Sequence, residues 1–215
     1  MSGAMGTVDW SLYLVTDPVL GGGPDRVVDI ATRAVAGGAT VVQLRDKHAT
    51  DAEVEATAAA LLDAVDVPVF LNDRVEVARR LRCHLHIGQT DMPFPRARAL
   101  LRDDQMIGLS VGSDTELDAV IALDGRGPDV IGIGPAFDTT TKANAPAGLG
   151  VERVHVLADR ARAAAIASVA IGGIDADRAS LFTGTAVNGI CVVSAIMAAA
   201  DPAAAARDLK EAYTR

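Results

Sequence analysis

Short apolar stretches alternate with amphipathic stretches along almost the whole chain. The apolar stretches have the length and the β-branched composition of strands. Eight strands are predicted, over 11–16, 40–45, 67–72, 83–88, 106–111, 130–135, 167–173 and 189–195. The stretches that follow them repeat apolar residues at helical spacing. Helices are therefore predicted over 25–36, 51–64, 74–81, 95–101, 115–123, 151–164, 175–182 and 202–213.

Eight strand–helix units in series predict right-handed crossovers and a parallel sheet. The expected fold is α/β, a single compact (β/α)8 TIM barrel over 11–215, preceded by a flexible N-terminal segment over 1–10. A doubly wound open sheet is the alternative, but the regular count of eight argues against it. In addition, no Gly-rich dinucleotide fingerprint follows the first strand. Met1–Gly6 has neither the basic start nor the apolar core of a signal peptide.

Composition narrows the class of protein further. Half of the 215 residues are hydrophobic, which suits one domain with a full core. A net charge of −8 and an aromatic content of 3% do not fit nucleic-acid binding, which favours basic patches and stacking rings. The longest apolar stretch, 189–200, is too short to span a bilayer. Cys83 and Cys191 lie in apolar runs and are expected to be reduced core residues of a cytoplasmic protein. The sequence leaves a homo-oligomer open.

The end of the second predicted strand carries polar side chains on one face. Because side chains alternate along a strand, Gln43, Arg45 and, if the strand continues, Lys47 share one side. A strand buried in a parallel sheet is normally apolar on both faces. Burial of these groups is costly unless an anion or a hydrogen-bonding group meets them. We therefore expect a set of donors for a phosphorylated ligand, with a solvent-exposed edge strand as the alternative.

Further polar residues follow the neighbouring strands, where barrel enzymes keep their catalytic groups. Asp73 and Asp91 follow the third and fourth strands. Each could cap the next helix, but together they fit magnesium, which is typically held by one or two carboxylates, substrate phosphates and waters. Asn72 could contact a ligand or close a turn. Ser110 lies on the fifth strand, near its end.

Two later segments have the composition of phosphate sites. The longest loop, 136–150, contains Thr139–Thr141 and Lys142, whose hydroxyls and ammonium group are phosphate ligands; a flexible solvated loop is the alternative. Gly172–Gly173 at the end of strand seven could be a tight turn or could expose backbone N–H groups to phosphate. Ser194, near the end of strand eight, would complete such a site.

The histidines carry a weaker signal. His84 and His86 lie on one face of the fourth strand, and His86 either borders the site or is a satisfied core histidine. No arrangement of Ser, His and Asp or of Cys and His indicates a protein nucleophile.

Seven stretches, in order along the chain, resemble thiamine-phosphate synthases. They are 12–17, 43–47, 72–74, 88–91, 139–142, 170–174 and 192–196. The resemblance implies a (β/α)8 barrel that joins a hydroxymethylpyrimidine diphosphate to a thiazole phosphate with Mg²⁺, giving thiamine phosphate and diphosphate. A thiazole tautomerase of the same fold and a non-catalytic phosphate-ligand binding barrel are the alternatives. The combination of cationic and carboxylate residues argues against the tautomerase, whereas the binding barrel stays open.

The resemblance also implies roles for individual residues. The pyrimidine diphosphate would be held by Gln43, Leu44, Arg45, Asp46, Lys47, Asn72, Ser110 and Lys142. Of these, Arg45, Lys47, Ser110 and Lys142 would be catalytic. Magnesium would be held by Asp73 and Asp91. The thiazole phosphate would be held by Thr139, Thr140, Thr141, Gly173, Val193 and Ser194. The chain departs from the family pattern at Gly112, Asp138, Thr140, Ala143 and Asn144.

Overall fold

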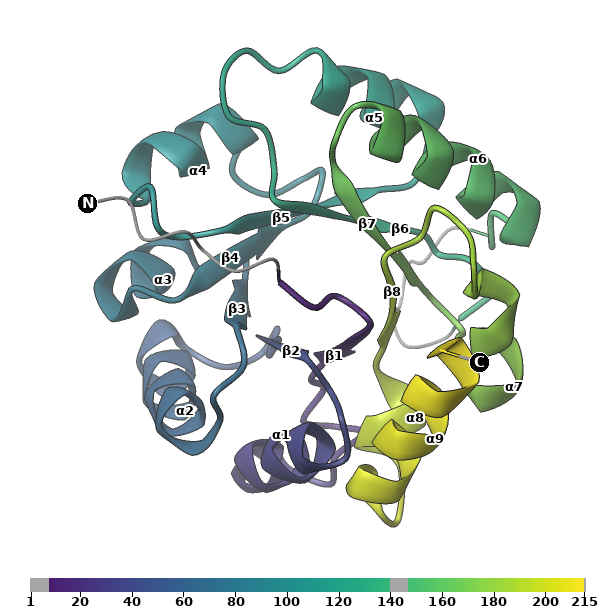
Figure 1. The fold of residues 1–215 in the computed structure, drawn as a ribbon. Helices are drawn as coiled ribbons and strands as arrows, with labels where there is room; N and C mark the ends of the chain where they lie inside the picture. Colours follow the sequence, from purple (N-terminus) through teal and green to yellow (C-terminus); the bar gives the residue numbers. More distant parts are fainter. Residues whose placement is uncertain (1–7, 140–146, 215) are drawn as a thin grey trace.

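The computed structural model describes residues 8–139 and 147–214 and contains a closed, parallel barrel (Figure 1). Its strands pair in chain order, and β8 closes the ring on β1. The strands are β1 (Leu12–Val15), β2 (Val41–Leu44), β3 (Val69–Asn72), β4 (His84–Ile87), β5 (Ile107–Val111), β6 (Val130–Ile133), β7 (Ala167–Ile171) and β8 (Gly189–Val192). The predicted (β/α)8 barrel is confirmed, and the open sheet is wrong.

Helices surround this ring and separate successive strands. They are η1 (Pro24–Arg26), α1 (Val27–Ala36), α2 (Asp51–Ala64), α3 (Val75–Leu81), α4 (Phe94–Leu100), α5 (Asp114–Ile121), α6 (Val151–Ala163), α7 (Ala176–Ala179), η2 (Ser180–Phe182), α8 (Ser194–Met197) and α9 (Pro202–Thr214). The last helix, α9, lies beside α1, so the end of the chain covers the start of the barrel.

Several strands end earlier than predicted, and two of these differences move candidate side chains. The strand predicted over 189–195 ends at Val192, because the backbone of Val193 leaves the extended conformation and Ser194 begins α8. The strand predicted over 40–45 ends at Leu44, which places Arg45 in the following loop. Both changes move side chains from the barrel wall to its rim, which is the end of the barrel formed by the carboxyl ends of the strands.

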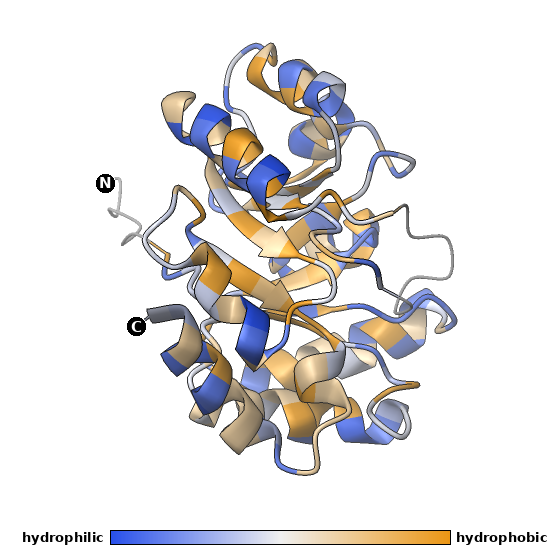
Figure 2. Ribbon diagram, turned by 90° about the vertical axis from the view of Figure 1, so that its right-hand side faces the viewer, coloured by the Kyte–Doolittle hydropathy of each residue, from blue (hydrophilic) through white to orange (hydrophobic). Residues whose placement is uncertain are grey.

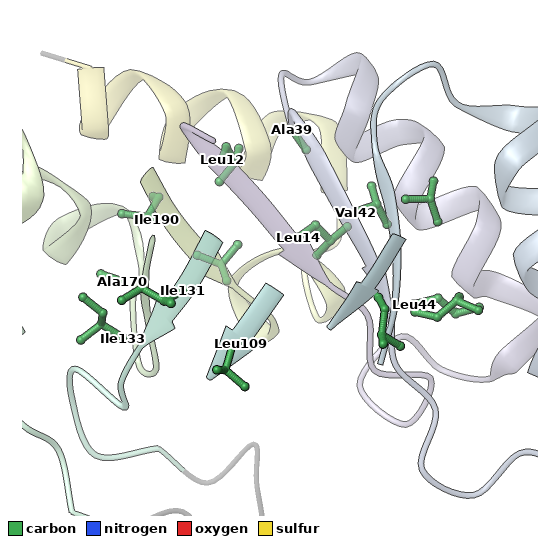
Figure 3. Close-up of a cluster of buried hydrophobic side chains, with 14 of the residues drawn as sticks. Leu12, Leu14, Ala39, Val42, Leu44, Leu109, Ile131, Ile133, Ala170 and Ile190 are labelled. Carbon is green, nitrogen blue, oxygen red and sulfur yellow. The ribbon is translucent and has the colours of Figure 1, made fainter. Parts of the chain in front are cut away.

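The hydrophobic core has two separate parts, one on each side of the barrel wall. The larger part lies between the strands and the helices and includes Leu12, Leu14, Val42 and Leu44 (Figure 3). The smaller part fills the barrel itself, where the rings of Trp10 and Tyr13 are stacked and that of Phe70 packs against both at a tilt. In Figure 2 the strands are predominantly hydrophobic, whereas the helices also carry many hydrophilic residues.

Trp10 belongs to the segment expected to be flexible, yet it is buried inside the barrel. Trp10 is therefore part of the barrel core, together with residues that follow it in the predicted barrel. Residues 1–7 lie outside the described part of the chain.

Cys83 and Cys191 are free and buried, as the sequence predicts. Burial raises the pKa of the Cys83 thiol to about 12, because a thiolate is poorly solvated there. Among the described residues, no helix combines the length and the apolar character needed to cross a membrane.

Gly189→Ala should destabilise the barrel. A Cβ at this first residue of β8 would lie 1.7 Å from the carbonyl oxygen of Trp10, so the backbone of one strand end would have to move. Such overpacking costs about 1–3 kcal/mol or more, and each kcal/mol lowers the Tm of a chain of this size by about 2–4 °C. Thermal denaturation measures the change. Gly127→Ala is the control, because its Cβ would meet nothing within 4 Å; equal Tm values for both variants would contradict the prediction.

Candidate active site

Polar side chains line the inside of the barrel on four neighbouring strands. The strand register places these residues on the same inner face as Tyr13 and Phe70. They are Gln43 on β2, Asn72 on β3, His86 on β4 and Ser110 on β5. The other half of the inner face at this level is apolar or lacks a side chain, with Val15, Gly132, Ile171 and Val193. At this level the interior of the barrel thus has a polar half and an apolar half.

Gln43 is buried, with 4% of its surface exposed, and its Nε2 donates to the Tyr13 Oη at 3.0 Å. Gln43 is thus a buried polar residue inside the fold, and a surface edge strand is wrong. The role of Gln43 as a donor to a phosphorylated ligand stays a prediction. The shared strand face predicted for Gln43, Arg45 and Lys47 stops at Gln43, because β2 ends one residue later.

The loop after β2 brings two cations to the rim. The Arg45 N–H donates to Thr16 Oγ1 at 3.0 Å, which fixes the start of the loop. The Arg45 guanidinium lies 3.8 Å from the Asp17 carboxylate, and the ammonium group of Lys47 pairs with the carboxylate of Asp73. Both cationic side chains therefore pair with carboxylates in the loops that follow the neighbouring strands β1 and β3.

Two other predicted ligands in this loop have structural partners. The Leu44 side chain is buried in the core between barrel and helices, so it faces away from the barrel interior. The Asp46 carboxylate accepts from the N–H groups of His48 and Ala49, at 2.9 and 3.0 Å, and closes a turn. These contacts position the loop that carries Arg45 and Lys47.

Asp73 follows β3 in a left-handed backbone conformation, with φ of 54°. Its N–H donates to the His86 carbonyl at 2.9 Å, and its carboxylate contacts Lys47 and, at 3.1 Å, Arg74. The helix α3 begins at Val75, and its N-cap has no side-chain hydrogen bond. The alternative that Asp73 caps this helix is therefore wrong. Its carboxylate instead attracts two cations at the rim.

Asp91 also does not cap the following helix, whose N-cap is Pro93 without a side-chain bond. Its Oδ2 accepts from the N–H of Gly88 at 2.6 Å. Since Asp73 is hydrogen-bonded to β4 and Gly88 directly follows β4, the two aspartates lie on the same rim at adjacent strand ends. Within 8–139 and 147–214, no group of three or more His, Cys, Asp and Glu could hold a metal. A metal here would take these two carboxylates and complete its shell with other oxygens.

Ser110 makes hydrogen bonds with two residues of β4 and the loop that follows it. Its Oγ lies 3.0 Å from His86 Nε2, and its carbonyl accepts from Gln89 Nε2 at 2.5 Å. Burial lowers the pKa of His86 to about 4, an effect that the Asp91 carboxylate partly opposes. His86 is thus neutral at pH 7 and contacts a candidate site residue rather than the apolar core alone.

On the opposite side of the rim, two glycines adopt backbone conformations that favour glycine. Gly172 and Gly173 have φ of 105° and 64°. The Gly172 carbonyl accepts from the Phe137 N–H at 3.1 Å, and the Gly173 carbonyl accepts from Arg178 Nη1 at 2.6 Å. The Arg178 guanidinium also lies 4.6 Å from the ring centre of Phe137. These contacts fix the loop that follows β7 (loop seven) against the start of the loop that follows β6 (loop six).

The remaining predicted residues lie near the Gly172–Gly173 loop or outside the described residues. Val193 is the N-cap of α8, and Ser194 is the exposed first residue of that helix. Thr139 is partly buried at the end of the described range. Asp138, a departure from the family pattern, accepts from the Gly148 N–H at 2.8 Å and so closes the base of loop six. Thr140, Thr141, Lys142, Ala143 and Asn144 lie outside the described residues.

Several positioning contacts were not predicted from the sequence. Asp17, Arg74, Gln89 and Arg178 each hold a candidate residue or the loop that carries it. Asp17, Arg74 and Gln89 lie close to a strand end, which was the signal available, whereas Arg178 lies farther along, in α7. Asp17 and Gln89 contact residues that follow or belong to other strands, and such pairings cannot be derived from spacing along the chain. Arg74 and Arg178 instead contact Asp73 and Gly173, which precede them in the same strand–helix unit.

Three comparisons place this geometry among known proteins. A family model described as thiamine monophosphate synthase matches residues 12–196. The thiamine-phosphate synthase of Syntrophomonas wolfei is 38% identical over 213 residues, which are 96% of this chain and 98% of that protein. The solved thiamine phosphate pyrophosphorylase from Pyrococcus furiosus has a TM-score of 0.81 and 31% identity, and the match covers 96% of both chains.

A longer relative also matches. The thiamine biosynthesis multifunctional protein ThiED of Corynebacterium efficiens is 50% identical over 212 residues. These are 95% of this chain but only 29% of that protein. The chain thus spans less than a third of the multifunctional relative and nearly the whole length of the Syntrophomonas one.

Proposed function

Because the chain belongs to the thiamine monophosphate synthase family, we propose that it joins 4-amino-2-methyl-5-(diphosphooxymethyl)pyrimidine to 4-methyl-5-(2-phosphooxyethyl)thiazole. The products are thiamine phosphate and diphosphate. The observation that carries this proposal is the division of the barrel mouth. Cations and carboxylates follow β2 to β4, and a glycine loop with a nearby hydroxyl follows β7 and β8. Such a division fits two different phosphorylated substrates.

In this reaction the bond between the pyrimidine methylene and the diphosphate oxygen breaks, and its electron pair leaves with the diphosphate. The thiazole nitrogen then forms a bond to the electron-poor methylene carbon. Arg45 and Lys47 would contribute fixed positive charge where negative charge develops on the leaving group. The rim would hold the two substrates in contact, which lowers the entropic barrier. No protein nucleophile is required.

Asp73 and Asp91 are the residues that would hold Mg²⁺. The fit rests on the donor chemistry: two carboxylates lie at adjacent strand ends, and that of Asp73 already attracts Lys47 and Arg74. When bound, Mg²⁺ supplies Lewis-acid neutralisation of the diphosphate charge. Lys47 would leave Asp73 and turn its ammonium group to the diphosphate, while Arg74, also bonded to the Ala49 carbonyl, would stay in place.

Gly173, Val193 and Ser194, together with Thr139–Thr141, would hold the thiazole phosphate. Ser194→Ala should raise the KM for the thiazole phosphate, because a lost hydrogen bond costs about 0.5–3 kcal/mol depending on charge. The KM for the pyrimidine diphosphate should stay unchanged. Ser180→Ala, which removes an exposed hydroxyl on η2, is the control. Equal rises in both KM values would contradict the division into two subsites.

One assay tests the proposed function. The purified protein is mixed with both substrates and Mg²⁺, and diphosphate and thiamine phosphate are quantified over time. We expect both products in equal amounts, and none when either substrate is omitted. Isomerisation of the thiazole compound without diphosphate release would indicate a tautomerase. Binding of both compounds without turnover would indicate a non-catalytic binding protein, and either outcome would overturn the proposal.

A further inference from the structure

The polar half of the barrel interior contains a histidine with one partnered and one unpartnered ring nitrogen. His86 Nε2 lies 3.0 Å from Ser110 Oγ. His86 Nδ1 is fully buried and has no hydrogen-bond partner. A buried polar atom without a partner is uncommon and costs free energy. Within the described residues, the His86 side chain therefore makes its hydrogen bond through Nε2 alone.

Two glycines make room for this imidazole. A Cβ on Gly108 of β5 would lie 2.4 Å from His86 Nδ1, and a Cβ on Gly132 of β6 would lie 3.7 Å from its Cε1. The ring therefore packs directly against the backbone of β5 and close to that of β6, where larger residues would displace it. This packing restricts the orientation of the ring and keeps Nε2 on Ser110.

The same contact favours one tautomer. A neutral imidazole carries a single N–H, on either Nδ1 or Nε2. At Gly108 the position of the missing Cβ belongs to a Cα–H, which faces Nδ1 and can act as a weak donor to its lone pair. A proton on Nδ1 would meet that Cα–H and would have no acceptor, and buried N–H groups without an acceptor are rare. The proton therefore resides on Nε2 and is donated to Ser110.

We propose that His86 is a positioning residue that donates its Nε2–H to Ser110 Oγ and so directs the Ser110 hydroxyl proton to a ring nitrogen of the pyrimidine substrate. Gln89 supports this arrangement through its bond to the Ser110 carbonyl. The pyrimidine ring, rather than the diphosphate, is the partner because Ser110 lies in the neutral interior beside Gly132, whereas the cations lie at the rim. The proposal deepens the proposed function and rests on it.

The first test is kinetic and uses three variants. His86→Leu should raise the KM for the pyrimidine diphosphate about tenfold, the effect of one lost hydrogen bond, and leave that for the thiazole phosphate unchanged. His86→Gln keeps an amide donor and should recover most of the loss. In a Ser110→Ala background, His86→Leu should add little, because both changes remove one interaction. His84→Leu is the control: this histidine lies on the same strand face, but its Nδ1 accepts from the Met106 N–H.

The second test is spectroscopic and needs no turnover. The ¹⁵N NMR spectrum of histidine-labelled, wild-type protein should show His86 protonated on Nε2 and bare on Nδ1. The opposite tautomer would overturn the proposal, and so would equal effects of His86→Leu and His84→Leu on both KM values. A wild-type protein that forms no thiamine phosphate would overturn the proposed function instead, and the NMR result would still decide the role of His86.

Discussion

Replacing Lys47 with methionine should slow diphosphate release and, at the same time, tighten metal binding to the free protein. The ammonium group of Lys47 occupies the carboxylate of Asp73, so a divalent cation must displace it. Methionine removes this competitor but keeps a long unbranched side chain. The Lys47 side chain is 42% exposed, and exposed ion pairs contribute about 1 kcal/mol or less. Metal affinity should therefore rise only about two- to fivefold.

The loss of activity should be much larger. In the proposed reaction Lys47 would be one of the fixed charges that stabilise the departing diphosphate, and removal of one such contact costs on the order of a hundredfold in kcat. Titration with Mn²⁺, followed by electron paramagnetic resonance, measures the metal affinity, and diphosphate release measures the rate. Arg79→Met removes a cation that pairs with Glu76 on the exposed side of α3 and is the control. Weaker metal binding in the Lys47 variant would contradict the displacement.

Much of the fold follows from local sequence pattern. Alternation of apolar and helical stretches was sufficient to predict every strand of the barrel, because a parallel strand covered by helices is apolar on both faces. The same rule made Gln43 stand out, and it is a buried polar group inside the barrel. Short-range rules were less reliable at the rim. Val193 departs from the extended conformation although its side chain is β-branched, and α8 follows where the strand was expected to continue.

The sequence predicts which polar residues lie on or after each strand, but not the contacts that these residues make with other strands. Asp73 precedes a helical stretch and has the residue type of an N-cap, but its positive φ and its bond to β4 turn the carboxylate to Lys47. The sequence cannot tell whether His86 borders the site or is a satisfied core histidine. Its contact with Ser110 depends on a glycine at position 108 of the next strand. Both outcomes depend on residues that become neighbours only when the barrel closes.

Asp73→Asn and Asp91→Asn should each raise the magnesium concentration required for half-maximal activity about tenfold or more. Magnesium prefers charged oxygen ligands, and each substitution removes one negative charge without changing the shape of the side chain. An asparagine at position 91 can still accept from the Gly88 N–H through its amide oxygen, so the turn that follows β4 should keep its conformation. In the proposed site both carboxylates act through one ion, so the double variant should require little more magnesium than the poorer single variant.

A purely structural role would give a different pattern. If the aspartates only held their loops, each substitution would lower the Tm, the two losses would add, and the magnesium requirement would not change. Activity measured against magnesium concentration, with thermal denaturation alongside, separates the two cases. Asp51→Asn is the matched control, because Asp51 lies 3.3 Å from Arg74, a cation it shares with Asp73, but its side chain is 64% exposed at the start of α2. A normal magnesium requirement in both single variants would remove Asp73 and Asp91 from the metal site and leave them as residues that shape the rim.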